Sequence, residues 1–168
     1  LAADGELLQR QLGQYAQPVA NGFAALNQAY FLDGGFVYVP RDQVIAEPIQ
    51  FVYVTTAAQS GAAFHPRNLI IAGDHSQVTI LESYVALGGA GYLTNAVTEL
   101  YAGDSARVEL VKFQDEATDA FHIAGFDGEF GRASQVNVHS FALGAKLSRN
   151  NIHTKLAGEG LECVLNGL

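Results

Sequence analysis

The first fifth of the chain differs from the rest in its hydrophobic pattern, because its apolar residues have the spacing of helices. Apolar residues recur every three to four positions in residues 7–15 and again in residues 19–31, with Pro18 between the two runs. Asn21 is expected to cap the second helix, and the Asp-Gly-Gly sequence at 33–35 to end it. The pattern therefore predicts two short helices before the main body of the chain.

From residue 36 onward, apolar residues alternate with residues that have a weaker tendency to be buried, with a period of two. This alternation is typical of half-buried strands. The residues expected to face the interior in the first two segments are Phe36, Tyr38, Ile49, Phe51 and Tyr53. No helical pattern of useful length follows, which argues against strand–helix–strand units. We therefore expect an N-terminal helical segment or cap over residues 1–34 and a mainly β core over residues 35–168.

Four segments of this core repeat one pattern that begins at a glycine. The glycines are Gly73, Gly103, Gly131 and Gly158, at intervals of 30, 28 and 27 residues. The fifth residue past each glycine is Val78, Val108, Val136 or Cys163, and the seventh is Ile80, Leu110, Val138 or Leu165. Three of the four residues between these two apolar positions are polar, so each segment is interpreted as a strand with one buried face.

Repeats of nearly constant length without helices predict a parallel β-helix with coils of about 27–30 residues. Equivalent residues of successive coils then lie about 4.8 Å apart, so Val78, Val108 and Val136 should form one interior column. An antiparallel β-sandwich is the alternative, and it predicts repeats whose length varies with the loops. The chain has no methionine and stops at the apolar Leu168, so we expect a β-helix truncated at its C-terminal end.

The histidines show none of the short spacings that bind zinc or iron. A second set of similar segments lies between the glycine turns, and its alignment places His122 between Asn95 and Asn150 of the neighbouring coils. That column is expected to be a polar ladder and not a metal site. His139 takes a place that apolar residues hold in earlier coils, so it should be partly buried, whereas His75 should lie in a solvated turn.

Cys163 is the only cysteine of the chain, which excludes an internal disulfide and favours a reducing compartment. Its column partners are valines, so we expect a small core residue and not a nucleophile or an iron ligand. Cys163 and His139 are therefore only weak metal candidates. No residue is assigned to catalysis or to cofactor binding.

Acidic residues form two groups in the second half of the chain. These are Asp115, Glu116 and Asp119, and then Asp127 and Glu129. Cleavage of a glycosidic bond needs two carboxylates that face each other across a cleft, but both groups are expected in solvated connecting segments. The net charge of −8 leaves no basic surface for nucleic acid, and no apolar run is long enough to cross a membrane.

Short motifs follow one another from about residue 20 to the end of the chain. They are ALN at 25–27, DGGFVYVP at 33–40, EPI at 47–49, HPRNLIIAG at 65–73, LESY at 81–84, TNAVTE at 94–99, AFHI at 120–123, HSF at 139–141, SRN at 148–150, GEG at 158–160 and LNGL at 165–168. In this order they resemble the SufB/SufD family of the SUF iron–sulfur assembly machinery, and their spacing is more similar to its SufD branch. The resemblance implies a right-handed parallel β-helix.

The resemblance also implies a non-catalytic scaffold subunit that pairs with a SufB-like paralogue through the β-helix. The SufC ATPase would bind only through a C-terminal helical domain that these residues do not include. An iron–sulfur cluster would be held transiently by the parent complex, with no cofactor in this segment, in the cytoplasm or the plastid stroma. The family's late Cys-x-His pair has no counterpart here, and Cys163 does not take its role. The alternatives are a β-helical carbohydrate-active enzyme and a self-associating structural module that forms homodimers.

Overall fold

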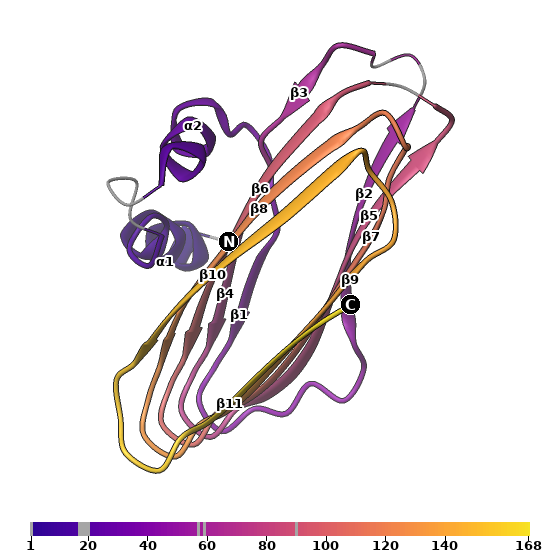
Figure 1. Ribbon diagram of the computed structural model, residues 1–168. Helices are drawn as coiled ribbons and strands as arrows, with labels where there is room; N and C mark the ends of the chain where they lie inside the picture. The colour runs from indigo at the N-terminus through magenta and orange to yellow at the C-terminus, as the bar shows by residue number, and fades with distance from the viewer. Residues whose placement is uncertain (1, 17–20, 57, 59, 90) are drawn as a thin grey trace.

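The chain is built from a helical start and two parallel sheets, as a computed structural model shows for residues 2–16, 21–56, 58, 60–89 and 91–168 (Figure 1). The helices are α1 (Ala2–Gln11) and α2 (Gly22–Tyr30). The strands are β1 (Phe36–Val39), β2 (Ile49–Thr56), β3 (Ala63–Phe64), β4 (Arg67–Ala72), β5 (Gln77–Leu87), β6 (Leu93–Ala102), β7 (Arg107–Asp115), β8 (Phe121–Phe130), β9 (Gln135–Ala142), β10 (Leu147–Leu156) and β11 (Glu162–Gly167).

The strands alternate between two sheets, so that each coil contributes to both. Sheet A has the order β1-β4-β6-β8-β10, with β3 also beside β6, and sheet B has the order β2-β5-β7-β9-β11. The strand pairs of both sheets are parallel. Figure 1 shows the sheets facing each other across the tube that successive coils enclose. The predicted parallel β-helix is confirmed, and the antiparallel sandwich is wrong.

The predicted interior columns are confirmed by the register of sheet B. Val78 pairs with Val108, Val108 with Val136, and Val136 with Cys163. The second column runs in the same way through Ile80, Leu110, Val138 and Leu165. Across the tube, apolar residues of sheet A complete this core. They include Ile70, Leu100, Phe126 and Phe130.

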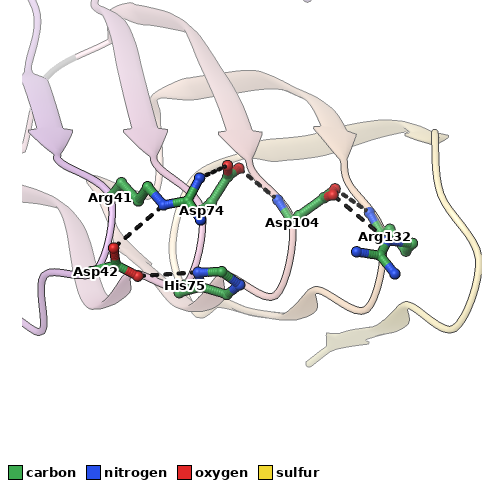
Figure 2. A network of polar contacts seen from close by, with 6 residues as sticks. All are labelled: Arg41, Asp42, Asp74, His75, Asp104 and Arg132. Atoms are coloured by element: carbon green, nitrogen blue, oxygen red, sulfur yellow. Dashed lines mark hydrogen bonds and ion pairs between the residues drawn. The ribbon is translucent and has the colours of Figure 1, made fainter.

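The turns that begin at the repeat glycines stack at one corner of the tube, where Asp74, Asp104 and Arg132, each one residue past a glycine, lie in a row (Figure 2). A Cβ atom at Gly103 would lie 2.8 Å from the backbone nitrogen of Asp74 and 2.5 Å from its Oδ1, and because the backbone cannot move aside, glycine is required there. That oxygen accepts the backbone N–H of Asp104 at 3.0 Å, and Oδ1 of Asp104 accepts the backbone N–H of Arg132 at 2.9 Å. The residue two past each glycine has a positive φ, as at His75 (57°). Close approach of neighbouring coils therefore explains the sequence repeat.

The first strand reverses the predicted phase. Val37 and Val39 face the core, with 8% and 1% exposure, whereas Tyr38 is 44% exposed. Pairing with β4 sets this phase, because Val37 lies beside the inward-facing Ile70. The segment has large apolar side chains on both faces, so alternation alone could not fix it. In β2 the predicted phase is confirmed, since Ile49, Phe51 and Tyr53 are less exposed than the residues between them.

The helical segment packs against the outer face of sheet A and does not close the end of the tube (Figure 1). Asn21 is the N-cap of α2 as predicted, and its side chain accepts the N–H of Phe23 at 3.0 Å. Pro18 and the start of the predicted second helix lie outside the described residues. Asn27 of α2 donates to the carbonyl oxygens of Pro66 and Asn95, which fixes the helix on the sheet.

A buried ion pair holds the segment between the helices. Nη2 of Arg67 lies 2.7 Å from Oε1 of Glu99, and both side chains are almost fully buried. The Glu99 carboxylate also accepts the backbone N–H groups of Gly13, Tyr15 and Ala16, at 2.9 to 3.1 Å. Loss of one ion would leave the other buried and unpaired, which is costly. The helical segment is therefore fixed to the β-helix by charge as well as by packing.

Candidate functional site

The interior of the tube is apolar in one half and polar in the other. The apolar half lies next to the glycine turns and contains the valine column. The polar half continues along the same strands, and the change comes between Ile80 and Glu82 in β5 and between Leu110 and Lys112 in β7. The buried polar residues of this half are Asn68, Glu82, Tyr84, Thr94, Thr98, Lys112, Gln114, Glu116 and His122. We call this set the polar lumen.

Glu116 is the centre of one group in the polar lumen. Its Oε1 accepts the hydroxyl of Thr94 at 2.6 Å, and its Oε2 accepts Nε2 of Gln114 at 3.1 Å. Nδ1 of His122 lies 2.6 Å from the same Oε2, with both side chains 1% exposed. Burial raises the pKa of Glu116, but its contacts with His122, Thr94 and Gln114 outweigh burial, so that the net shift is downward. Glu116 is therefore a buried carboxylate that stays ionised.

His122 is kept neutral in this environment. Burial lowers the pKa of His122, and the nearby charge of Lys112 lowers it further, against the opposing effect of Glu116. A neutral imidazole that donates from Nδ1 to Glu116 has an unprotonated Nε2. That atom is buried and has no hydrogen-bond partner among the described residues. His122 can therefore accept a proton or a hydrogen bond from within the tube.

Glu82 is the centre of the second group. Its Oε1 accepts Nδ2 of Asn68 at 3.0 Å and the hydroxyl of Thr98 at 2.6 Å. Oδ1 of Asn68 in turn accepts the hydroxyl of Tyr53. Burial raises the pKa of Glu82 despite these bonds. The pKa values of the two lumen carboxylates are thus shifted in opposite directions, because burial outweighs the partners of the more deeply buried Glu82, whereas the partners outweigh burial at Glu116.

Lys112 lies next to Glu82 on the neighbouring coil. Its Nζ is 5.2 Å from the centre of the Tyr84 ring, within range of a cation–π contact. Burial lowers the pKa of Lys112 to about 8, although the charges of Glu82 and Glu116 oppose the shift. Two carboxylates and one amine with shifted pKa values mark the polar lumen as the candidate site of the molecule.

The polar lumen reaches the surface at a cavity of about 380 Å³. Buried Tyr84, Thr94 and Glu116 line its inner part, and the exposed Tyr30 and Asp33 lie at its entrance. Strand β2 and residues 63–66 supply the remaining walls. We call this the mouth cavity.

The two weak metal candidates do not come together. Cys163 belongs to the interior column, and burial raises the pKa of its thiol. His139 lies on the outer face of sheet B, where its Nε2 is 3.1 Å from Oε1 of Glu109 and its Nδ1 is 3.2 Å from Nδ2 of Asn166. In the described part of the chain, no three His, Cys, Asp or Glu side chains are placed to hold one metal ion.

The predicted surroundings of His122 are wrong. Its partners in the register are Thr94 and Ser148, not Asn95 and Asn150. The predicted alignment was shifted by one residue at Asn95 and by two residues at Asn150. A shift by one residue moves a side chain to the other face of a sheet. Asn95 accordingly lies on the outer face, where its Nδ2 donates to the carbonyl oxygen of Phe23 in α2.

The prediction of solvated acidic groups is confirmed for Asp115 and Asp119, which are exposed, and is wrong for Glu116, Asp127 and Glu129. Glu116 is 5% exposed and faces the polar lumen. Asp127 and Glu129 belong to β8, and the Asp127 side chain is 14% exposed and 3.4 Å from His153. Glu116 points into the tube whereas Asp127 lies on the outer side of the wall, so these carboxylates do not face each other across a cleft.

Glu82, Lys112 and Gln114 are among the residues of the polar lumen that the sequence interpretation missed. A signal for them exists, because Glu82 and Lys112 both stand nine places past a repeat glycine. The period of two that places Val78 and Ile80 inside also places Glu82 inside. Charged residues at these inward positions mark a buried polar cluster.

Comparison with known proteins gives the family of the chain. The SUF system FeS cluster assembly, SufBD core domain matches residues 53–168, and the SufBD protein N-terminal region matches residues 1–51. No helix in the described residues is long and apolar enough to span a membrane.

Similar proteins carry the same family name. The chain is 32% identical over 155 residues to an iron–sulfur cluster assembly SufBD family protein of Synechocystis, which covers 86% of this chain and 34% of that protein. It is 34% identical over 114 residues to a chloroplastic SufBD family protein of Arabidopsis thaliana, covering 66% of this chain and 20% of that one. It is 35% identical over 85 residues to the iron–sulfur cluster assembly protein SufD of Bacillus subtilis, covering 50% of this chain and 19% of that one.

The chain therefore spans about a third of the length of the Synechocystis relative. The match to both family regions, the parallel β-helix and the ordered motifs agree. The chain belongs to the SufBD family of iron–sulfur cluster assembly proteins.

Proposed function

We propose that this chain is part of a non-catalytic scaffold for iron–sulfur cluster assembly, and that it binds a SufB-like paralogue through its β-helix. Family membership supports a role in cluster assembly. The proposal assigns the chain the task of positioning partners, with no substrate bond made or broken. The cluster itself is cargo of the complex, and no residue here is assigned as its ligand.

One observation favours a protein partner: the two outer faces of the tube differ. The helical segment packs on the outer face of sheet A, whereas no described helix packs on that of sheet B (Figure 1). Exposed apolar side chains gather on sheet B, and we call them the sheet B patch. They are Val52, Val54, Phe113, Phe141 and Leu143, at 37% to 60% exposure. Phe113 and Phe141 are direct neighbours in the register, and Ser83 lies between Phe113 and Val52. Exposed apolar side chains that gather on one face mark interaction sites.

Further partners follow from the family resemblance. SufC is expected to bind the complex and not this chain, since the resemblance places its contact in a C-terminal helical domain. A homodimer formed end to end by two β-helices is the alternative partner arrangement. The chloroplastic and bacterial relatives fit a location in the plastid stroma or the bacterial cytoplasm.

Co-expression with a SufB-type protein tests the proposal. The chain should co-purify with that protein, and the double substitution Phe113→Asp and Phe141→Asp should abolish co-purification while the circular dichroism spectrum stays unchanged. Tyr38→Asp is the matched control, because Tyr38 is an exposed aromatic residue on sheet A. Retention of the partner by the double variant would contradict the use of this patch, and failure of the unmodified chain to bind would contradict the pairing.

A further inference from the structure

The mouth cavity is not used by the proposed scaffold role, yet it has the dimensions of a small-molecule site. Its volume of about 380 Å³ is within the range of ligand pockets. It runs from Tyr30, which is 63% exposed, to the buried Tyr84 and Glu116. A ligand that enters it would leave solvent and meet a charged side chain at the inner end.

The walls of the mouth cavity are rich in aromatic rings. Tyr30 and His65 form a pair at its entrance, with ring centres 5.8 Å apart. Further in, Tyr53 stacks on Tyr84 with ring centres 4.9 Å apart. Phe64 also lines the cavity. Aromatic faces attract cations through their quadrupole and provide apolar contact area at the same time.

The charge of the lining is negative. It includes the carboxylates of Asp33 and Glu116 and contains neither lysine nor arginine. His65 is neutral at pH 7, because burial lowers its pKa. Glu116 receives hydrogen bonds from neutral groups only, and Lys112, the cation of the polar lumen, lies beside Glu82 on the neighbouring strand and also interacts with it. The negative charge of Glu116 is therefore only partly balanced.

We propose that the mouth cavity binds a small organic ammonium ion, with its amino group directed to Glu116 and its apolar part between the aromatic rings. A carboxylate at the inner end and aromatic walls select a cation over an anion of the same shape. The requirement for an apolar body selects an organic amine over a metal ion. Val52 and Val54 line the cavity and also belong to the sheet B patch, so the binding test uses the chain without a partner.

Titration calorimetry of the 168-residue chain at pH 7 tests this proposal with three probes of one shape. They are 2-phenylethylammonium, the neutral 2-phenylethanol and the anionic 3-phenylpropanoate. We expect the ammonium to bind at least tenfold more tightly than the alcohol, and the anion to bind most weakly. Absence of saturable binding of the ammonium, or equal affinity for the ammonium and the anion, would overturn the proposal.

Two substitutions and one control locate the site. Glu116→Gln should remove the preference for the ammonium over the alcohol, and Tyr30→Ala should weaken ammonium binding several-fold. Tyr30 is on the surface, so its variant tests the cavity even if Glu116→Gln is unstable. Glu109→Gln alters a carboxylate on the outer face of β7 and should change nothing. Unchanged ammonium binding in the Tyr30 variant would contradict the assignment to this cavity.

Discussion

The apolar and polar halves of the tube share strands, sheets and register, and they differ only in the side chains that point inward. In β7, Val108 and Leu110 face the core, and Lys112 and Gln114 follow on the same face. In the apolar half, shape and volume decide the packing. In the polar half, each carboxylate needs hydrogen-bond donors, which for Glu116 are Thr94 on the neighbouring β6 and Gln114 two residues before it. The comparison shows that a β-helix interior can be polar where several strands together satisfy each charge.

The two halves should respond differently to substitution. A lost side chain in the apolar half leaves a void, whose cost depends on the volume removed. A change in the polar half alters hydrogen bonds and protonation, so its cost depends on pH. Four experiments test this difference, from the largest expected effect to the smallest.

Phe130→Ala should give the largest loss, about 4 kcal/mol in the free energy of unfolding, because it empties a large volume in the apolar half. Phe130 is fully buried and packs in the core cluster. Urea denaturation monitored by circular dichroism measures the loss. The matched control is Phe113→Ala on the outer face, which should cost less than about 1 kcal/mol. Equal costs for the two variants would show that the apolar half is not the stabilising core.

Lys112→Met should change the pH dependence of stability. The pKa of Lys112 is lowered from 10.5 to about 8, so the cost of its buried charge is fully present below pH 8. That cost disappears between pH 8 and 10.5, where the unfolded chain still binds the proton. The unmodified chain should therefore gain up to about 3 kcal/mol over this interval relative to the variant. Urea denaturation at a series of pH values measures the difference.

Lys155→Met provides the control for that experiment, because Lys155 is exposed and pairs with Glu129 on the outer face. Its pH profile should run parallel to that of the unmodified chain. Parallel profiles for Lys112→Met as well would show that the Lys112 amine is solvated in the folded chain.

Glu116→Gln and Glu82→Gln form a matched pair within the polar half. Glu116→Gln should cost about 2 kcal/mol at pH 7, since it replaces an ionised acceptor of charge-assisted hydrogen bonds. Glu82→Gln should cost less than about 1 kcal/mol, because the raised pKa of Glu82 brings it closer to the neutral form that glutamine imitates. Thermal unfolding at pH 7 compares the stability of the two variants. A larger loss of stability for Glu82→Gln would contradict the assignment of Glu116 as the ionised carboxylate.

The same pair predicts opposite responses to acid. The pKa of Glu116 is lowered in the folded chain, so its contribution is present above the unfolded value of 4.5 and is lost as the pH falls through the folded pKa. The pKa of Glu82 is raised, so its contribution is full below 4.5 and is lost as the pH rises through the folded pKa.

The smallest effect is expected at the exposed turns. Asp104→Ala removes the acceptor for the N–H of Arg132, at a solvent-exposed position, and should cost no more than about 1 kcal/mol (Figure 2). Asp104→Asn keeps an acceptor oxygen and should be nearly neutral. Chemical denaturation distinguishes the two variants, and a cost for Asp104→Ala as large as that for Phe130→Ala would mean that the turns, and not the apolar half, hold the coils together.

The sequence predicts the apolar half well because a fixed physical constraint repeats there. Close stacking demands glycine at each turn, and the distance from that glycine to the inward valine, as from Gly103 to Val108, is constant. Alternation then gives the buried column. The first strand has no such glycine before it. Because Val37 and Tyr38 are both large and apolar, pairing with β4 decides which of them faces inward.

The polar half could not be derived in the same way. The segment of His122 has no turn glycine to fix its register. A shift of one residue therefore placed Asn95, which lies on the surface, beside His122 in the lumen. Glu116 was assigned to a solvated segment because carboxylates are usually exposed. Its burial depends on contacts with Thr94, Gln114 and His122, and although Gln114 is only two residues away, Thr94 comes from β6, which the coiling of the chain brings alongside.

The stacked turns at the glycine corner have a consequence for how such a protein can change length. The contacts that Asp104 makes in its turn are with the neighbouring turns. Its carboxylate accepts an N–H from the following turn, and its own N–H donates to the carboxylate of the preceding turn. Duplication or deletion of a whole coil would therefore join turns that still match. Insertion of one residue inside a strand would instead invert every inward position after it, so genetic variation in length should occur in whole coils or at the opposite corner.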